Sequence, residues 1–406
     1  MDTPVVVERG PKVRVVASPS TWIEGEALRQ LDATAGLAGM RLVVGMPDLH
    51  PGKGGPVGAA YLSDGFVHPV LVGSDIGCGM RLDALDLPLR KARPDRLAER
   101  LDGLDGPWDG DTAAWLAERG LEPTPHDAAL GTPGFGNHFV ELLAVEEVRD
   151  AVAFAAMGLE RERVHLLVHS GSRGLGEAVL RAHAERHGAA PLAAGTPEAA
   201  DYLAAHDRAV RWAAANRALC ARRACEAVGA DAAPILDVCH NLVSGTEVGG
   251  CRCWLHRKGA APADMGPVVI PGSRGDLSWL VRPVPGRDEA LRSLAHGAGR
   301  KIARGEARGK LRGLYRREDL RRNPWGGRVV CGEELLAWEE APEAYKPVAS
   351  VVGDLFAAGL AEPVAAFRPL VTFKTSEAPA GGAARGKPDW KRERREAREA
   401  KRGRGG

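Results

Sequence analysis

Apolar residues form short runs or alternate with polar ones through most of the first 80 positions. The segments KVRVVA, RLVVGMPDLHPG and AAYLSDGFVHPVLVG are bounded by glycine or proline, a pattern typical of β-strands joined by tight turns. Two later segments, PILDVCHNLV and GPVVIPGSRGDLSWLV, have the same pattern and end on polar residues. The hydrophobic pattern therefore predicts strands in all five segments.

A longer period indicates helices elsewhere in the chain. Residues 90–119, 146–159 and 201–228 have helical patterns, and a basic helix is predicted from residue 296 to about residue 312. The segment RVHLLVHSGSRGLGEAVLRAHAERH predicts a buried strand, a glycine loop and a helix. Because helices and strands mix without strict alternation, we expect an α+β fold with central sheets rather than a doubly wound sheet.

Composition narrows the class of protein. The chain has 406 residues, of which 44% are hydrophobic, enough to form a substantial core. No run of about 18 apolar residues indicates a membrane span, and the first residues lack the basic and apolar segments of a secretory signal. Seven widely spread cysteines favour free or metal-bound thiols in a reducing compartment. We therefore expect a cytoplasmic protein that does not associate with membranes.

Positive charge is concentrated near the end of the sequence. Residues 385–404 hold ten Lys or Arg against four Asp or Glu, although the whole chain has a formal net charge of only +2. This stretch is either a solvated tail or a polybasic arm that raises affinity for nucleic acid through the phosphates. His183, His187 and His206 lie on helical stretches rich in Ala and Arg, and we expect them to face solvent.

Five potential metal ligands stand beside glycine or asparagine at the ends of apolar segments. VLVGSDIGCGMRL places Asp75 and Cys78 three residues apart on a glycine-bounded turn. GTPGFGNHFVEL, HLLVHSGSRG and ILDVCHNLV supply His138, His169 and His240. Carboxylate, thiolate and imidazole together can bind borderline and hard metals. The set suits a two-metal centre in which the thiolate bridges both ions.

A fifth segment, SLAHGAGRKIAR, has the character of a phosphate site. His296 precedes three small residues, and Arg300 and Arg304 follow. Small residues let the backbone approach a phosphate group, and guanidinium groups can pair with its oxygens. His296 has two interpretations at this point: a fourth histidine ligand for a metal, or a nucleophile that takes a phosphoryl or nucleotidyl group on a ring nitrogen.

Nine segments, in order along the chain, resemble the signature segments of the RtcB RNA ligase family. They are MPDLHPGKGGPVGAA, VGSDIGCGM, GTPGFGNHF, HSGSRGLG, CHNLV, WLHRKGAAPADMGPVVIPGSRGDLSWLV, AHGAGR, APEAYK and FRPLVTFK. The resemblance implies one RtcB-like catalytic domain over residues 1–376, with a metal- and nucleotide-binding cleft formed by central sheets and flanked by helices. A basic, disordered tail would follow over residues 377–406.

The resemblance also implies an activity. Such enzymes are GTP- and Mn²⁺-dependent ligases that join RNA 3′-phosphate or 2′,3′-cyclic phosphate ends to 5′-hydroxyl ends, in tRNA splicing or RNA repair. The resemblance also implies RNA and GTP as partners and leaves open an archease-like activator protein, and we expect a monomer. Two other functions stay open: a metal-dependent phosphodiesterase or phosphatase acting on RNA ends, because two metals suffice for hydrolysis, and a non-catalytic RNA-binding protein.

Roles for single residues follow from the resemblance as well. One Mn²⁺ would be held by Asp75, Cys78 and His138. The other would be held by Cys78, His169 and His240, with the thiolate bridging. His296 would become guanylylated, and Asp48 would fix its tautomer. Contacts to the guanine nucleotide are implied for Asn137, His240, Asn241, Pro271, Gly272, Ser273, Arg274, Ser278, His296, Gly297, Ala298, Gly299 and Lys374. Candidates for holding RNA phosphates are Arg173, Lys258, Arg300 and Arg304.

Two features depart from the family pattern. The family's GSMG is GSRG here, which places Arg274 in a turn expected to face the nucleotide. About 32 residues follow Lys374, where members of the family usually end. Both departures leave the expected chemistry in place, but they leave the RNA substrate open.

Overall fold

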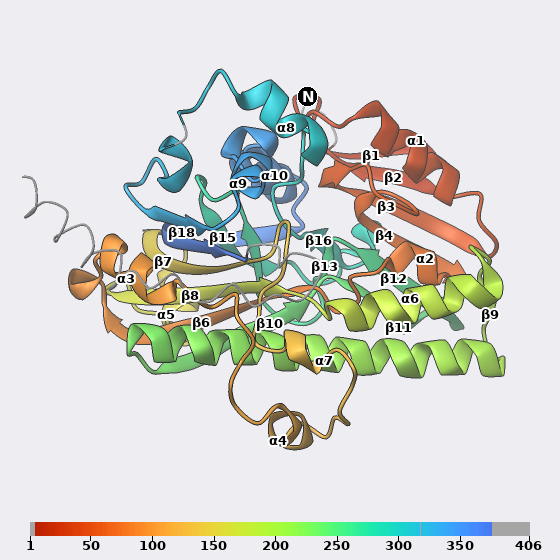
Figure 1. The fold of residues 1–406 in the computed structure, drawn as a ribbon. Helices are drawn as coiled ribbons and strands as arrows, with labels where there is room; N and C mark the ends of the chain where they lie inside the picture. The colour runs from red at the N-terminus through yellow and green to blue at the C-terminus, as the bar shows by residue number, and fades with distance from the viewer. Residues whose placement is uncertain (1–4, 317, 376–406) are drawn as a thin grey trace, which may run out of the picture. The chain divides into compact units, whose positions relative to one another are not determined.

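Two β-sheets form the centre of the fold in the computed structural model, which describes residues 5–316 and 318–375 (Figure 1). The six-stranded sheet has the order β1 (Val6–Gly10), β2 (Val13–Val16), β3 (Met40–His50), β4 (Val57–Asp64), β12 (Cys251–Lys258) and β11 (Asn241–Val248). The eight-stranded sheet has the order β10 (Ala232–Cys239), β6 (Gly79–Pro88), β8 (Arg163–Ser170), β7 (Phe139–Val148), β18 (Ala361–Lys374), β15 (Ser278–Pro283) and β14 (Val268–Pro271), and β17 (Arg328–Cys331) also pairs with β18.

Short strand pairs and helices complete the described chain. The short pairs are β5 (Phe66–Val67) with β9 (Leu192–Ala193), and β13 (Ala260–Pro262) with β16 (Ser293–Ala295). The helices are α1 (Gly25–Thr34), α2 (Pro69–Val72), α3 (Pro94–Leu101), α4 (Thr112–Ala117), α5 (Ala151–Ala156), α6 (Gly174–His187), α7 (Pro197–Val228), α8 (Arg304–Leu311), α9 (Glu334–Glu339) and α10 (Val348–Ala357). This mixture confirms the predicted α+β class.

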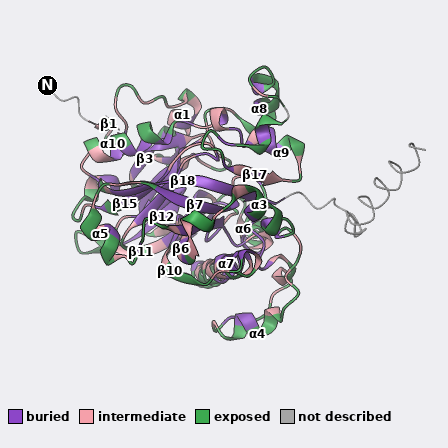
Figure 2. Cartoon of the chain, turned by 90° about the vertical axis from the view of Figure 1, so that its left-hand side faces the viewer, coloured by how far each residue is buried: buried purple, intermediate pink, exposed green. Residues whose placement is uncertain are grey.

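Apolar side chains fill the space between the sheets and under the helices. One cluster joins Val44 of the six-stranded sheet to Ile270 of the eight-stranded sheet and to Val351 of α10. A second places α3 and α7 on the eight-stranded sheet, where Leu166 of β8 packs in the same cluster as Ala224 of α7. Central strands such as β7 and β8 are accordingly buried, whereas β1, β10 and β11 at the sheet edges and the outer helix faces are largely exposed or half-buried (Figure 2).

The helix predictions are only partly confirmed. The helix predicted over residues 201–228 is present as α7, and the strand, loop and helix predicted around HSGSRGLG are β8 and α6. Residues 90–119 contain only the short helices α3 and α4, and residues 146–148 belong to β7. In that strand Val148 pairs with Ala365 of β18, so sheet pairing overrides the local helical pattern. The basic helix after residue 296 is limited to α8.

The segment PILDVCHNLV is not one strand, as its pattern predicts, but two. It forms β10 in the eight-stranded sheet and β11 in the six-stranded sheet, and His240 stands between them. The residue therefore lies where the chain passes from one sheet to the other. In residues 5–316 and 318–375, no helix is long and apolar enough to cross a membrane. The tail predicted for residues 377–406 lies outside these described residues.

Candidate metal and nucleotide site

Four neighbouring antiparallel strands bring the predicted metal ligands to one edge of the eight-stranded sheet. Because β10, β6, β8 and β7 alternate in direction, the starts of β6 and β7 lie beside the ends of β10 and β8. Cys78 and His138 immediately precede β6 and β7, His169 is near the end of β8, and His240 follows β10. Strand register therefore gathers these side chains.

The turn before β6 adds the fifth ligand, Asp75. Gly77 has a φ of +78°, a backbone conformation that residues with a side chain rarely adopt. The turn closes through a hydrogen bond of 3.1 Å from the backbone N–H of Cys78 to the carbonyl oxygen of Asp75. A Cβ at Gly171 would lie 2.0 Å from Oδ1 of Asp75, so glycine there leaves space for the carboxylate.

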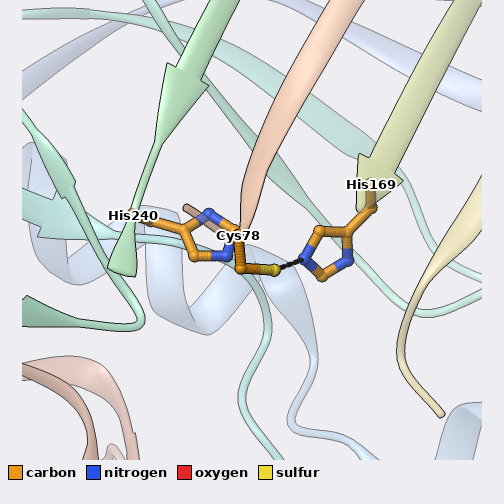
Figure 3. Close-up of side chains that lie close together, drawn as sticks. All are labelled: Cys78, His169 and His240. Atoms are coloured by element: carbon orange, nitrogen blue, oxygen red, sulfur yellow. Dashed lines mark hydrogen bonds between the residues drawn. The ribbon is translucent and has the colours of Figure 1, made fainter. Parts of the chain in front are cut away.

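The donor atoms converge in two overlapping groups that share one thiol. Asp75, Cys78 and His138 form one group, and Cys78, His169 and His240 form the other, with the donor atoms of each group within 4.8 Å of one another. Sγ of Cys78 lies 3.1 Å from Nε2 of His169 and 3.3 Å from Nε2 of His138. Figure 3 shows the Cys78 side chain between the rings of His169 and His240.

The electrostatic surroundings favour the metal-binding forms of the histidines and of Asp75, but they oppose ionisation of the Cys78 thiol. Burial, together with the neighbouring imidazoles, lowers the pKa of His169 and His240 well below the usual value, so both rings are neutral and keep a lone pair. Burial and then the Asp75 carboxylate raise the pKa of the Cys78 thiol. Burial opposes ionisation of Asp75, but the charge and hydrogen bond of His138 outweigh it and lower the pKa of the carboxyl.

The surroundings also fit metal ions. Nδ1 of His169 lies 3.2 Å from the carbonyl oxygen of Asn137, a contact that orients Nε2 toward the thiol. Nδ1 of His138 is buried without a hydrogen-bond partner in the described part of the chain. Mixed O, N and S donors accommodate borderline metals. The five residues can hold two ions that share the Cys78 sulfur.

Two residues of helix α7 form hydrogen bonds to the loops that carry the metal ligands. Arg217 is 1% exposed, and its guanidinium donates to the carbonyl oxygens of Gly77 at 2.6 Å and Ser170 at 3.0 Å, and to Asp237. Asn216 donates to the Ser170 hydroxyl at 2.9 Å. Neither residue is recognisable from the local sequence, where the two form only a polar pair within an Ala-rich helix.

We expect Arg217→Met to lower the free energy of unfolding by about 3–5 kcal/mol, because it removes the partner of Asp237 and leaves two carbonyl groups unsatisfied. Denaturant unfolding of the full chain measures this change. Arg222→Met is the matched control, since Arg222 lies on the same helix but pairs with Glu226 at the surface, a contact worth about 0.3–0.5 kcal/mol. Equal effects of both substitutions would contradict the positioning role of Arg217.

Beside the metal ligands lies a cavity of about 770 Å³. The predicted site residues that line it are Asp75, Cys78, Asn137, His169, His240, Asn241, Lys258, Pro271, Gly272, Ser273, Arg274, His296, Gly297, Ala298, Gly299, Arg300, Arg304 and Lys374. Asp48, His138, Arg173 and Ser278 are not among its lining residues. Most of the set predicted from the sequence therefore faces one space.

His296 is held in a defined orientation at this cavity. Its Nδ1 lies 2.6 Å from Oδ2 of Asp48, and its backbone N–H donates to the same oxygen at 3.2 Å. The Asp48 side chain is completely buried, whereas that of His296 is 11% exposed. Because the carboxylate accepts the Nδ1 proton, Nε2 keeps its lone pair. The centre of the His296 ring lies 4.8 Å from that of the His240 ring, so the His296 ring lies next to the metal ligands.

Charged groups are buried at another part of the cavity wall. Lys374 donates to Glu340 at 3.1 Å and to the carbonyl oxygens of Gly136 and His138. Burial alone would raise the pKa of Glu340, but Lys374 and Arg300 lower it to about 2. Burial raises the pKa of Glu141 to about 7, against a hydrogen bond from Thr372. Glu141 also lines the cavity and was missed by the sequence analysis, although it stands three residues after His138.

Several predicted contact residues are engaged within the protein. Arg300 donates to Glu340 at 3.0 Å and to the Tyr345 hydroxyl at 2.9 Å. Asn241 donates to the carbonyl oxygen of Asp75 and accepts from the N–H of Gly259. These side chains organise the cavity wall.

Lys258, Arg173 and Ser278, which were predicted to contact RNA phosphates or the nucleotide, also contact other parts of the protein. Nζ of Lys258 donates to the carbonyl oxygens of Lys53 and Gly55. The guanidinium carbon of Arg173 lies 5.7 Å from the centre of the Phe135 ring. Ser278 pairs with Pro271 at the start of β15 and is buried.

The Arg274 guanidinium is also committed to internal hydrogen bonds. It donates to the carbonyl oxygens of Leu320 at 2.7 Å, Glu340 at 3.0 Å and Ala337 at 3.2 Å. Arg274 is 5% exposed. The residue that replaces methionine in the GSRG turn thus ties this turn to the segment around α9.

Comparison with known proteins gives a consistent result. The sequence model of the family described as "tRNA-splicing ligase RtcB" matches residues 30–106 and 105–375. The chain is 48% identical over 367 residues to RNA-splicing ligase RtcB2 of Escherichia coli, a match that covers 90% of this chain and 96% of the relative. It is 34% identical to RNA-splicing ligase RtcB of Mycobacterium bovis, with 82% and 97% covered. It is 31% identical to tRNA-splicing ligase RtcB of Archaeoglobus fulgidus, with 87% and 92% covered.

Proposed function

Because the chain belongs to the RtcB family of RNA ligases, we propose that it joins RNA 3′-phosphate or 2′,3′-cyclic phosphate ends to 5′-hydroxyl ends, using GTP and two Mn²⁺ ions. One observation carries the proposal. His296, held through Nδ1 by buried Asp48, lines the same cavity as four of the five metal donors. A nucleophile with a free Nε2 beside donor groups for two metals is an arrangement that supports nucleotidyl transfer.

In the first step, Nε2 of His296 attacks the α-phosphorus of GTP. The Nε2–P bond forms, the bond from the α-phosphorus to the bridging oxygen breaks, and pyrophosphate leaves. Asp48 stabilises the positive charge that develops on the ring, because its carboxylate accepts a hydrogen bond from Nδ1–H throughout the step. When bound, Mn²⁺ ions would offset negative charge on the phosphate oxygens.

In the second step, the RNA 3′-phosphate attacks the same phosphorus and His296 leaves as a neutral ring. The RNA end is then activated, and attack of a 5′-hydroxyl on the 3′-phosphorus forms the phosphodiester and releases GMP. A 2′,3′-cyclic end is first opened by water. Arg304 is exposed at the cavity and can contact RNA phosphates on entry.

Ligation of a 3′-phosphorylated RNA to a 5′-hydroxyl RNA tests the proposal directly. With Mn²⁺ and GTP, we expect joined product and one GMP for each new bond, and no product without GTP. Opening of cyclic ends is the internal control for metal-dependent activity. Removal of the 3′-phosphate or opening of cyclic ends in the absence of GTP, with no joined product in its presence, would favour the phosphodiesterase or phosphatase alternative.

Glu141 is the group in the cavity wall best suited to guanine. Guanine presents an N1–H and an N2 amine on one edge, and a carboxylate can accept from both. We expect Glu141→Gln to raise the KM for GTP about 10- to 100-fold, the equivalent of a charged hydrogen bond of about 1.5–3 kcal/mol.

Inosine triphosphate, which lacks the N2 amine, is the matched comparison for this variant. The wild-type protein should prefer GTP over inosine triphosphate in covalent labelling, and Glu141→Gln should lose most of that preference. An unchanged preference would show that another group recognises the amine.

A further inference from the structure

Helix α8 carries a row of three arginines, of which only the first has a role in the proposed reaction. Arg304, Arg308 and Arg312 recur every four residues, so they lie on one face with a rise of about 6 Å between successive members. Ala307 and Leu311 are buried and attach the helix to the protein. We call Arg304, Arg308 and Arg312 the α8 arginine row.

No acid of the described part of the protein forms an ion pair with Arg308 or Arg312, whereas the charge of Arg304 helps to lower the pKa of Glu340. All three residues are exposed, and none has an ion pair within residues 5–316 and 318–375. The acid on this helix, Glu306, pairs instead with Lys310 at 2.7 Å. Because these two residues follow Arg304 by two and six positions, they lie on the opposite face of α8. The helix therefore separates a neutralised face from a positive one.

The row begins at the cavity of the site. Arg304 and the preceding Lys301 line the cavity together with His296. Nη2 of Arg304 lies 3.2 Å from Oδ1 of Asn137, the residue before the metal ligand His138. From there Arg308 and Arg312 lead away along a helix that lies at the edge of the molecule with exposed side chains (Figure 2). A chain whose end occupies the cavity meets the row as it leaves.

We propose that the α8 arginine row binds the sugar–phosphate backbone of the RNA strand beyond the end that is joined. The inference rests on the proposed function, since it takes RNA as the substrate. A polyanion is the partner that fits a line of unpaired, solvated guanidinium groups continuous with a phosphate-handling cavity. Because Arg308 and Arg312 contact backbone and not bases, the contact extends affinity without reading sequence.

The test uses the full chain with the double substitution Arg308→Glu and Arg312→Glu. The matched control is Arg186→Glu with Arg208→Glu, which reverses the same charge on exposed arginines of α6 and α7. Both views place α6 and α7 away from α8 (Figures 1 and 2). RNA affinity is measured by fluorescence anisotropy over a range of salt concentrations, with a long 3′-phosphorylated RNA and a 3′-phosphorylated dinucleotide.

We expect the α8 variant to bind the long RNA about tenfold or more weakly at low salt. The slope of log affinity against log salt should fall in magnitude by about 1.4, the value for two lost phosphate contacts to a single strand. Dinucleotide affinity and covalent labelling by GTP should stay unchanged. The control variant should keep the wild-type slope.

Three results would overturn the inference: an unchanged slope for the long RNA, an equal loss for the dinucleotide, or an equal loss in the control variant. The milder pair Arg308→Gln and Arg312→Gln, with circular dichroism, guards against misfolding and should lose affinity in the same direction. Failure of the proposed function is distinguishable, because the wild-type protein itself would then show no labelling by GTP.

Discussion

We expect His296→Ala to abolish covalent labelling of the protein by α-labelled GTP and to leave metal binding intact. The nucleophilic Nε2 disappears, whereas the two ligand groups do not include this residue. Labelled protein on a denaturing gel is the measurement. Asp48→Asn should slow labelling by several orders of magnitude, up to about the 10⁴-fold seen when the aspartate of a serine-protease triad becomes asparagine, because the amide can favour the wrong tautomer.

His50→Ala is the matched control for His296→Ala. The two rings stack with centres 6.4 Å apart, and His50 lines the same cavity. Burial lowers the pKa of His50 to about 4, and its Nδ1 lies 2.9 Å from the carbonyl oxygen of Asp48, so the ring is neutral and engaged with the backbone. Label that persists in His296→Ala and disappears in His50→Ala would move the nucleophile to His50.

The second large effect is expected at Cys78. Because its thiol belongs to both ligand groups, Cys78→Ala removes a donor from each, and we expect binding of both Mn²⁺ ions and all ligation to be lost. His240→Ala should be milder, since it leaves Asp75, Cys78 and His138 complete as a site for one ion. Calorimetric titration with Mn²⁺ gives the number of ions bound to each variant.

Cys239→Ser separates the shared thiol from its neighbour. Cys239 precedes His240, but its thiol donates to the carbonyl oxygen of Asn241 and belongs to neither ligand group. This variant should bind as many ions as the wild-type protein. One ion retained in Cys78→Ala would mean that the sulfur is not shared, and the two groups would have to be reassigned.

Strand-end chemistry is the part of the site that local sequence could predict. Asp75, Cys78 and the three histidines were recognisable because each stands where an apolar run ends beside glycine or asparagine. In an antiparallel sheet such ends meet at one edge, and the observed register has this result. The order of the strands in the sheet was not predictable, because it depends on pairings between segments far apart in the chain.

Helix burial shows where the local pattern fails. His183 and His206 were expected to face solvent, but they are 5% and 1% exposed. Helices α6 and α7 pack together, with the ring centres of His183 and Tyr202 6.1 Å apart, and Nε2 of His206 accepts the backbone N–H of Val243 at 3.1 Å. The sequence around a histidine in an Ala-rich helix does not indicate a hydrogen-bond partner in a distant strand. Burial of this kind is therefore evident only from the three-dimensional structure.

Arg274 gives the complementary case for a motif. Resemblance to the family implies a nucleotide contact for Arg274, whose turn lines the cavity, and that contact stays a prediction. The guanidinium also donates to three main-chain carbonyl groups, those of Leu320, Ala337 and Glu340. A motif aligns backbone positions well, but the direction of a long side chain depends on distant carbonyl groups that no local pattern identifies.

Because the ligand set is assembled from segments between Asp75 and His240, binding of the proposed ions would make metal supply a determinant of how long the protein survives. An unfolded chain cannot hold these five donors together, so folding and ion uptake form one linked equilibrium. At a free ion concentration about 100-fold above the dissociation constant, mass action adds about 2.7 kcal/mol to the folded state. In a cell starved of the ion, the unfolded fraction and its turnover by proteases would rise, and the abundance of this RtcB family member would fall.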